Sequence, residues 1–300
     1  MDLQRLFLFL IFVFSLGLVW DGWQRHQHPE LYVQQSTAAN EALPKPQATP
    51  PAASIPTVLP PAASTQAAIA QQPVRQAAGK TIYVKTDMLE AEISTIGGDI
   101  NRLALLKHPD GQDKNKPLVL FHRGAGTHNY VAQSGLLGAG LPNHNSTFVS
   151  EQDRYVLSGN AEQVQVRLNA ESDSALKVVK VITFHKGSYL VDVAYELENT
   201  GQQAATASSY FQLVRDSAAL AGSSMFLPTY VGAAVYTDKE KFQKVEFPEI
   251  EKGKIDYPKQ ADDGWIGVLQ QYFVAIWLPK EKTNREYFTR KLDGDSYSVG

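Results

Sequence analysis

Apolar and polar residues alternate along much of this chain after residue 80, and this period of two restricts the fold more than any other feature. In residues 163–171, Val164, Val166 and Leu168 are separated by polar residues. Successive side chains of a β-strand point to opposite faces, so the pattern is typical of antiparallel sheets with one face on a core and one in water. Further stretches of this kind occupy residues 82–93, 177–199, 208–216, 232–238, 242–247 and 285–292. We therefore predict that residues 80–300 form a mainly β domain, a large antiparallel β-sandwich with few helices.

Glycine-containing turns separate the predicted strands. Gly97 and Gly98 interrupt the alternation after residue 93, and Lys186 and Gly187 divide residues 177–199 into two strands. Glycine accepts the backbone conformations that tight turns require. These positions are therefore predicted to be turns between neighbouring strands.

The first 28 residues differ from the rest because an almost unbroken apolar run fills them. Residues 3–23 make up about 21 residues, enough to cross a hydrocarbon core of about 30 Å as a helix. Five residues mark the predicted anchor, with a cation at one end and indoles at the other: Arg5, Leu6, Phe12, Trp20 and Trp23. A cleavable signal peptide is the alternative, but no small-residue cleavage site directly follows the apolar run. We predict an uncleaved transmembrane anchor in the lipid bilayer, with the N-terminus in the cytoplasm and the bulk of the chain on the far side.

Residues 29–79 are rich in Pro, Ala, Gln, Ser and Thr and almost lack aromatic residues. Such a segment buries too little apolar surface to offset its chain entropy. It is predicted to be a disordered linker between the anchor and the β domain. A Pro-rich ligand for a partner domain is the alternative.

Charge and composition exclude several classes of function. The net charge of −3 argues against nucleic-acid binding, which calls for a basic surface. The sequence contains no cysteine, which rules out thiol catalysis and Cys-ligated metal sites. No spacing of His and carboxylate residues forms a catalytic or metal-binding motif, so we predict a protein without a cofactor, a metal or an enzymatic activity.

The stretch GWIGVLQQYFVAIWLP, residues 264–279, is the most apolar part of the β domain. It is too short for a membrane span, and two glutamines would lie at its centre. We predict two core strands with a bend at the glutamines, both buried on their two faces at the middle of a sheet. Their core aromatic residues are Trp265, Tyr272, Phe273 and Trp277. An aromatic platform for a ligand or partner is the alternative.

Residues 236–263 combine charges of both signs with Phe242, Phe247 and Tyr257. Polar segments that carry aromatic residues are typical of the rims of protein interfaces. The segment is a candidate partner surface, and a plain solvated excursion is the alternative.

Four segments together resemble the YidC-type membrane protein insertases of Gram-negative bacteria. They are MDLQR at the start, VKTDMLEAEISTIGGDI at 84–100, YVAQSGLLG at 130–138 and GWIGVLQQYFVAIWLP at 264–279. The resemblance implies a β-supersandwich in the periplasm, similar to galactose mutarotase-like proteins. It also implies a place in the bacterial inner membrane and a role in inserting and folding inner-membrane proteins, alone or with the Sec translocon. Its implied partners are nascent inner-membrane proteins and, for the part corresponding to residues 236–263, the accessory subunits of the translocon.

Members of that family continue with further membrane helices that form the insertion groove, and this sequence contains none of them. We therefore expect an N-terminal fragment in which the end of the periplasmic domain, residues 80–300, is also truncated. Such a fragment would provide a scaffold and docking site and would not insert proteins by itself. An envelope carbohydrate-binding or mutarotase-like domain is the alternative function, because the implied fold is shared with sugar-binding proteins.

Overall fold

The computed structural model describes residues 79–124, 128–138, 140–171, 175–219 and 230–300. The predicted anchor, residues 1–28, lies outside the described residues, and so does the predicted linker except for Gly79. In the described part of the chain, no helix has the length and hydrophobicity that a membrane crossing requires.

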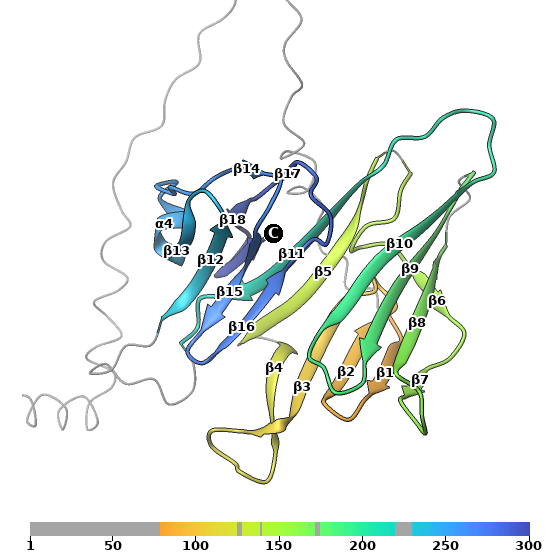
Figure 1. Cartoon of the computed structure of the whole chain (residues 1–300), viewed down its shortest axis with the longest axis horizontal. Helices are drawn as coiled ribbons and strands as arrows, with labels where there is room; N and C mark the ends of the chain where they lie inside the picture. Colours follow the sequence, from red (N-terminus) through yellow and green to blue (C-terminus); the bar gives the residue numbers. More distant parts are fainter. Residues whose placement is uncertain (1–78, 125–127, 139, 172–174, 220–229) are drawn as a thin grey trace, which may run out of the picture. The chain divides into compact units, whose positions relative to one another are not determined.

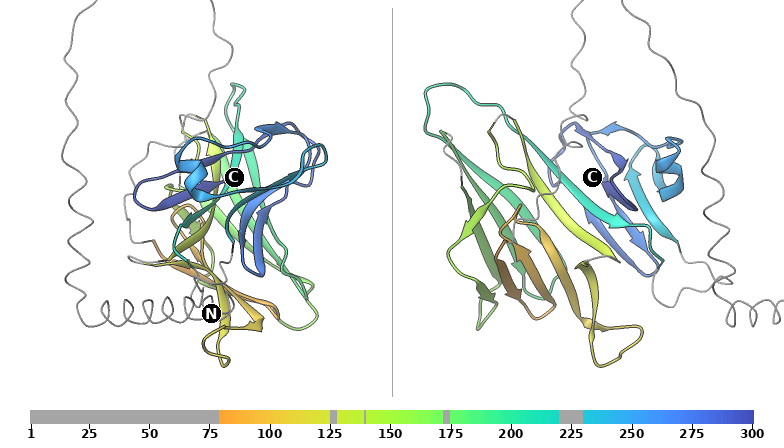
Figure 2. Two further views of the ribbon diagram at one scale, coloured as in Figure 1. Left: turned by 90° about the vertical axis from the view of Figure 1, so that its left-hand side faces the viewer. Right: turned by 180° about the vertical axis from the view of Figure 1, so that it is seen from behind.

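One large sheet of nine strands forms the framework of the domain (Figure 1). Neighbouring strands in it are antiparallel except for the parallel pair β1–β7. In the view from behind, its strands from β1 to β11 run side by side (Figure 2). Its members in spatial order are β18 (Thr289–Lys291), β19 (Ser296–Val299), β11 (Ser208–Asp216), β5 (Asn129–Leu137), β4 (Pro117–Arg123), β3 (Ile100–Pro109), β2 (Leu89–Ser94), β1 (Thr81–Lys85) and β7 (Arg154–Val156).

Two four-stranded antiparallel sheets accompany the large sheet. The first, here called the β9 sheet, has the order β10 (Val191–Asn199), β9 (Leu176–His185), β8 (Gln163–Ala170) and β6 (Phe148–Ser150). The second, the β15 sheet, has the order β13 (Lys241–Val245), β12 (Val231–Thr237), β15 (Trp265–Gln270) and β16 (Phe273–Trp277). A two-stranded ladder of β14 (Gln260–Ala261) and β17 (Arg285–Glu286) and the short helix α4 (Phe247–Glu251) complete the described elements.

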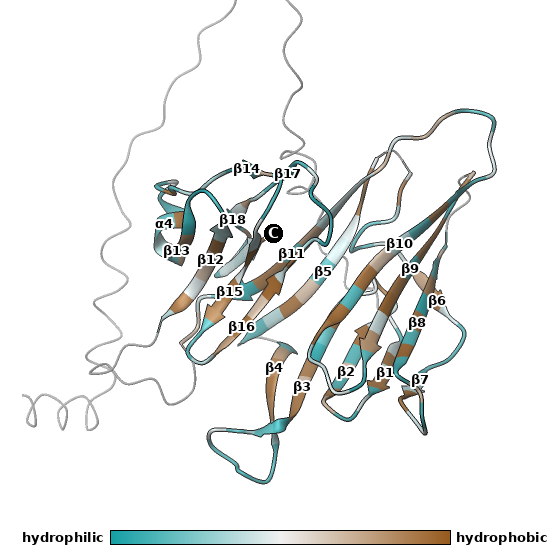
Figure 3. Cartoon of the chain, in the orientation of Figure 1, coloured by the Kyte–Doolittle hydropathy of each residue, from teal (hydrophilic) through white to brown (hydrophobic). Residues whose placement is uncertain are grey.

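The strands form where the sequence alternates. In β1 and β2 every second residue is buried, and bands of hydrophobic and hydrophilic residues follow one another along β8, β9 and β10 (Figure 3). The turns lie where the glycines predict them, with positive φ angles at Gly97, Gly98 and Gly187. The predicted mainly β, antiparallel architecture is therefore confirmed.

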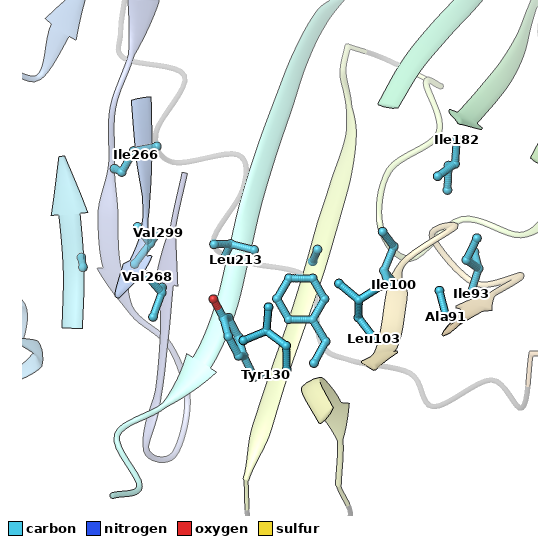
Figure 4. Close-up of a cluster of buried hydrophobic side chains, with 14 of the residues drawn as sticks. Ala91, Ile93, Ile100, Leu103, Tyr130, Ile182, Leu213, Ile266, Val268 and Val299 are labelled. Carbon is cyan, nitrogen blue, oxygen red and sulfur yellow. The ribbon is translucent and has the colours of Figure 1, made fainter. Parts of the chain in front are cut away.

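The hydrophobic core joins all three sheets. Ile93 and Leu213 of the large sheet lie in one cluster with Ile182 of the β9 sheet and with Ile266 and Val268 of the β15 sheet (Figure 4). Removing each such side chain from water contributes about 1.5–3 kcal/mol. The two smaller sheets thus pack on the large sheet through a shared core, as in a β-sandwich.

The apolar stretch at 264–279 forms the predicted pair of strands, β15 and β16, which are antiparallel neighbours. The prediction that both are buried on their two faces in the middle of a sheet is wrong for β16, which is the last strand of its sheet and exposes Val274 and Ile276 on the face that points away from the core. Tyr272 lies in the turn between the strands and is 86% exposed. Phe273 and Trp277 pack partly buried against the core, whereas Trp265 points to the opposite face.

Candidate docking surface

The face of the β15 sheet that points away from the core is apolar at most positions and carries one lysine, Lys244 of β13. Cross-strand registers place Phe242 of β13, Tyr236 of β12 and Trp265 of β15 in one row across this face. Two further rows bring Ile276 beside Gly267, and Val274 beside Leu269. Side chains two residues apart in a strand share a face, so these rows form one surface, and Leu278 continues the parity of β16 just beyond its end. We call this surface, made of Tyr236, Phe242, Trp265, Leu269, Val274, Ile276 and Leu278, the apolar face.

Several side chains of the apolar face are open to solvent. Phe242 and Val274 are each 46% exposed, Ile276 is 36% exposed and Leu278 is 58% exposed. The indole of Trp265 lies 6.1 Å from the ring of Tyr236 at an interplanar angle of 12°, and 6.1 Å from the ring of Phe242. Contiguous exposed apolar surface of this kind marks interaction sites on soluble domains.

The β16 strand is an edge strand of this sheet, as far as the described residues show. It pairs with β15 on one side and is the terminal strand of the order β13-β12-β15-β16. Edge strands present unpaired N–H and C=O groups that can add a strand from another chain. The apolar face and this edge therefore lie together on one sheet.

The predicted partner residues divide between this face and the core. Phe242 belongs to the apolar face, as expected for a surface residue. The surface assignment is wrong for Phe247 and Tyr257, which are buried. Phe247 opens α4 and stacks on Tyr297 at 4.6 Å, and the Tyr257 hydroxyl lies 3.1 Å from Oγ1 of Thr289. Phe247 and Tyr257 therefore pack in the core although they lie in a charged segment.

The anchor residues Arg5, Leu6, Phe12, Trp20 and Trp23 lie outside the described residues. Among the residues that the structure does describe, no group of three or more His, Asp or Glu side chains is placed to hold a metal ion. A cavity of about 540 Å³ on the β9 sheet is lined by charged and aliphatic residues and carries no aromatic ring. Sugar sites pair aromatic platforms with convergent polar groups, so this cavity gives the carbohydrate alternative no support.

The sequence analysis did not predict a buried polar cluster that lies beside the core. Lys180 of β9 is buried and donates a hydrogen bond from Nζ to the carbonyl oxygen of Gly97 at 2.8 Å. Asp99, also buried, accepts hydrogen bonds at Oδ2 from Gln133 at 2.7 Å and from Arg123 at 3.2 Å. Strand parity could have predicted the burial of Lys180, because it lies on the same inward face of β9 as Val178 and Ile182. Its partner could not be found that way, because Gly97 is distant in the sequence.

Comparison with known proteins relates this chain to a protein family. The sequence model of the YidC periplasmic domain matches residues 81–300. Membrane protein insertase YidC of Nitrosospira multiformis is 45% identical over 309 residues, which cover 100% of this chain and 54% of the relative. The proteins of the same name from Aromatoleum aromaticum and Nitrosomonas europaea are 43% and 38% identical, again over 100% of this chain, and the matches cover 53% and 51% of their lengths.

The chain thus spans about half the length of the curated relatives that it matches. The names of these relatives describe an insertase and not an enzyme. From the extent of these matches, the chain belongs to the YidC family of membrane protein insertases, with the periplasmic domain of that family in residues 81–300.

Proposed function

We propose that this chain is the non-catalytic scaffold and docking portion of an insertase in the bacterial inner membrane. Its β domain would lie in the periplasm, tethered through residues 29–79 to a transmembrane anchor at residues 1–28. The whole protein, about twice this length, would insert inner-membrane proteins and help them to fold, alone or with the Sec translocon. Nascent inner-membrane proteins would be handled by the part that this chain lacks.

The apolar face is the observation that carries the docking role. Its partly exposed residues Phe242, Val274, Ile276 and Leu278 lie on a sheet whose other face already packs on the core. About half of their surface therefore remains in water, and contact with a partner protein would remove it from water. We infer that the partners are the accessory subunits of the Sec translocon, which the family resemblance implies.

Site-specific photo-crosslinking in the full-length protein tests this proposal. A photoreactive residue in place of Ile276 samples the apolar face, and one in place of Val156, on the exposed side of β7 in the large sheet, provides the matched control. In membranes that contain the Sec translocon and its accessory subunits, we expect an adduct with an accessory subunit from position 276 and several-fold less from position 156. Equal yields from both positions, or adducts from position 156 alone, would rule out the apolar face as the docking site.

A further inference from the structure

The buried cluster around Asp99 joins the large sheet to the β9 sheet. Asp99 follows the turn between β2 and β3, and Lys180 reaches that turn from β9 with its bond to Gly97. A second polar contact between the two sheets, of 2.9 Å, joins Ser134 of β5 and Tyr195 of β10. The cluster is therefore a polar fastening between two packed sheets.

The turn fits tightly against the β9 sheet. Gly97 and Gly98 have φ angles of 73° and 62°, a left-handed conformation that glycine adopts without strain. A Cβ atom on Gly98 would lie 2.8 Å from Cδ1 of Leu168 and 2.9 Å from Cδ of Lys180. The Gly97 N–H also donates to the carbonyl oxygen of Ser146 at 2.8 Å. Both the amide and the carbonyl of Gly97 are therefore engaged when the turn is closed.

Every charged or titratable group that faces Asp99 belongs to a different element. Arg123 comes from β4, Lys180 from β9, Tyr195 from β10 and Tyr210 from β11. His144, from the segment that follows β5, interacts with Lys180 and Arg123 of this cluster. Within the described part of the chain, Oδ1 of Asp99 is buried and accepts no hydrogen bond. Arg123, whose side chain is 42% exposed, lies 3.2 Å from Oδ2 of the buried carboxylate.

Burial determines how these groups bind protons. It raises the pKa of Asp99 from 3.8 to about 6, although Lys180, Gln133 and Arg123 act against it. It lowers the pKa of Lys180 to about 8, so this ammonium is charged in mild acid and begins to lose its proton only near the upper end of the range from pH 5 to 7.5. Burial raises the pKa of Tyr195 and of Tyr210, which keeps both neutral. His144 works in the opposite direction from Asp99, because burial lowers its pKa to about 4.

We propose that Asp99 makes this contact a pH-responsive latch, which holds the Gly97–Asp99 turn against β9 more tightly in mild acid than at neutral pH. The sign follows from linkage. A carboxyl group with a higher pKa in the closed state than in water binds protons preferentially when the turn is closed, so acid favours closure. At neutral pH the buried carboxylate is charged and the latch is at its weakest.

Amide hydrogen exchange of the full chain in micelles tests the latch. The readout is the protection factor of the Gly97 amide, which donates to the carbonyl oxygen of Ser146 outside the turn. The variant is Asp99→Asn, and Asp153→Asn makes the same change at an exposed carboxylate. Because His144 is present in every variant, the ratio of wild type to Asp99→Asn isolates the contribution of Asp99.

We expect this ratio to rise about tenfold from pH 7.5 to pH 5, as linkage gives for a pKa of about 6 when closed and 3.8 when open. The ratio of wild type to Asp153→Asn should stay constant. A constant ratio for Asp99→Asn as well would overturn the latch. If Asp99→Asn does not fold, the protection factor of the Gly97 amide is divided by that of the β12–β15 amides, in the wild type and in Lys180→Gln. The latch is upheld if this ratio changes with pH in the wild type and the midpoint of the change differs in Lys180→Gln. A ratio that does not change with pH overturns the latch.

Discussion

Gly98 and Gly187 both adopt left-handed backbone conformations in turns between strands, but their surroundings differ. A Cβ on Gly98 would press on Leu168 and Lys180, whereas a Cβ on Gly187 would meet no atom within 4 Å. We expect Gly187→Ala to lower the free energy of unfolding by about 1 kcal/mol through backbone strain alone. Gly98→Ala should lower it by about 2–4 kcal/mol, because overpacking adds to the same strain. Urea denaturation of both variants measures the difference, and equal losses would show that the turn is not held against β9.

The buried pair Asp99 and Lys180 shows where residue-level reasoning from the sequence ends. Alternation in β9 places Lys180 on the inward face, so its burial could have been predicted. Its hydrogen-bond partner depends on how two sheets meet, and no local pattern encodes that contact. Most buried polar groups have such a partner, so their sites follow from the assembled fold.

At the scale of elements, the sequence predicted strands well and their exposure poorly. The hairpin of β15 and β16 lies where the apolar run predicts it, but both faces of β16 are apolar for different reasons. Phe273 and Trp277 pack on the core, whereas Val274 and Ile276 alternate with them toward solvent. The sequence does not distinguish an apolar residue that is exposed for contact with a partner from one that packs in the core. Which face of the β15 sheet packs on the core decides between the two, and that is a property of the assembled fold.

Neighbouring isoleucines of this hairpin allow the two roles to be separated by experiment. Ile266 is buried in the shared core, and Ile276, which pairs with the adjacent Gly267, lies on the apolar face. We expect Ile266→Ala to lower the free energy of unfolding by about 2–5 kcal/mol, since it leaves a cavity. Ile276→Ala should cost less than about 1 kcal/mol and should reduce binding of accessory subunits instead. Urea denaturation of the two variants provides the comparison, and a large loss for Ile276→Ala would mean that the apolar face is part of the core.

At the scale of the whole molecule, the β domain is one part of a longer architecture. The family model matches residues 81–300, and this chain covers about half of the length of its relatives. If residues 29–79 form the proposed tether, a docking domain joined to it would explore a wide volume, because the end-to-end distance of a flexible chain grows with the square root of its length. An open apolar face on such a domain could then meet a partner without fixing its distance from the membrane.

The proposed orientation of the chain can be tested directly, because the sequence contains no cysteine. We expect Ser158→Cys, on the exposed surface between β7 and β8, to react with a membrane-impermeant maleimide in intact spheroplasts. Asp2→Cys, next to the N-terminus, should react only after the membrane is opened, since the proposed anchor would place that end in the cytoplasm. The unsubstituted chain is the control and should remain unlabelled in both conditions. Labelling of Asp2→Cys in intact spheroplasts would reverse the proposed topology, and protection of Ser158→Cys would remove the β domain from the periplasm.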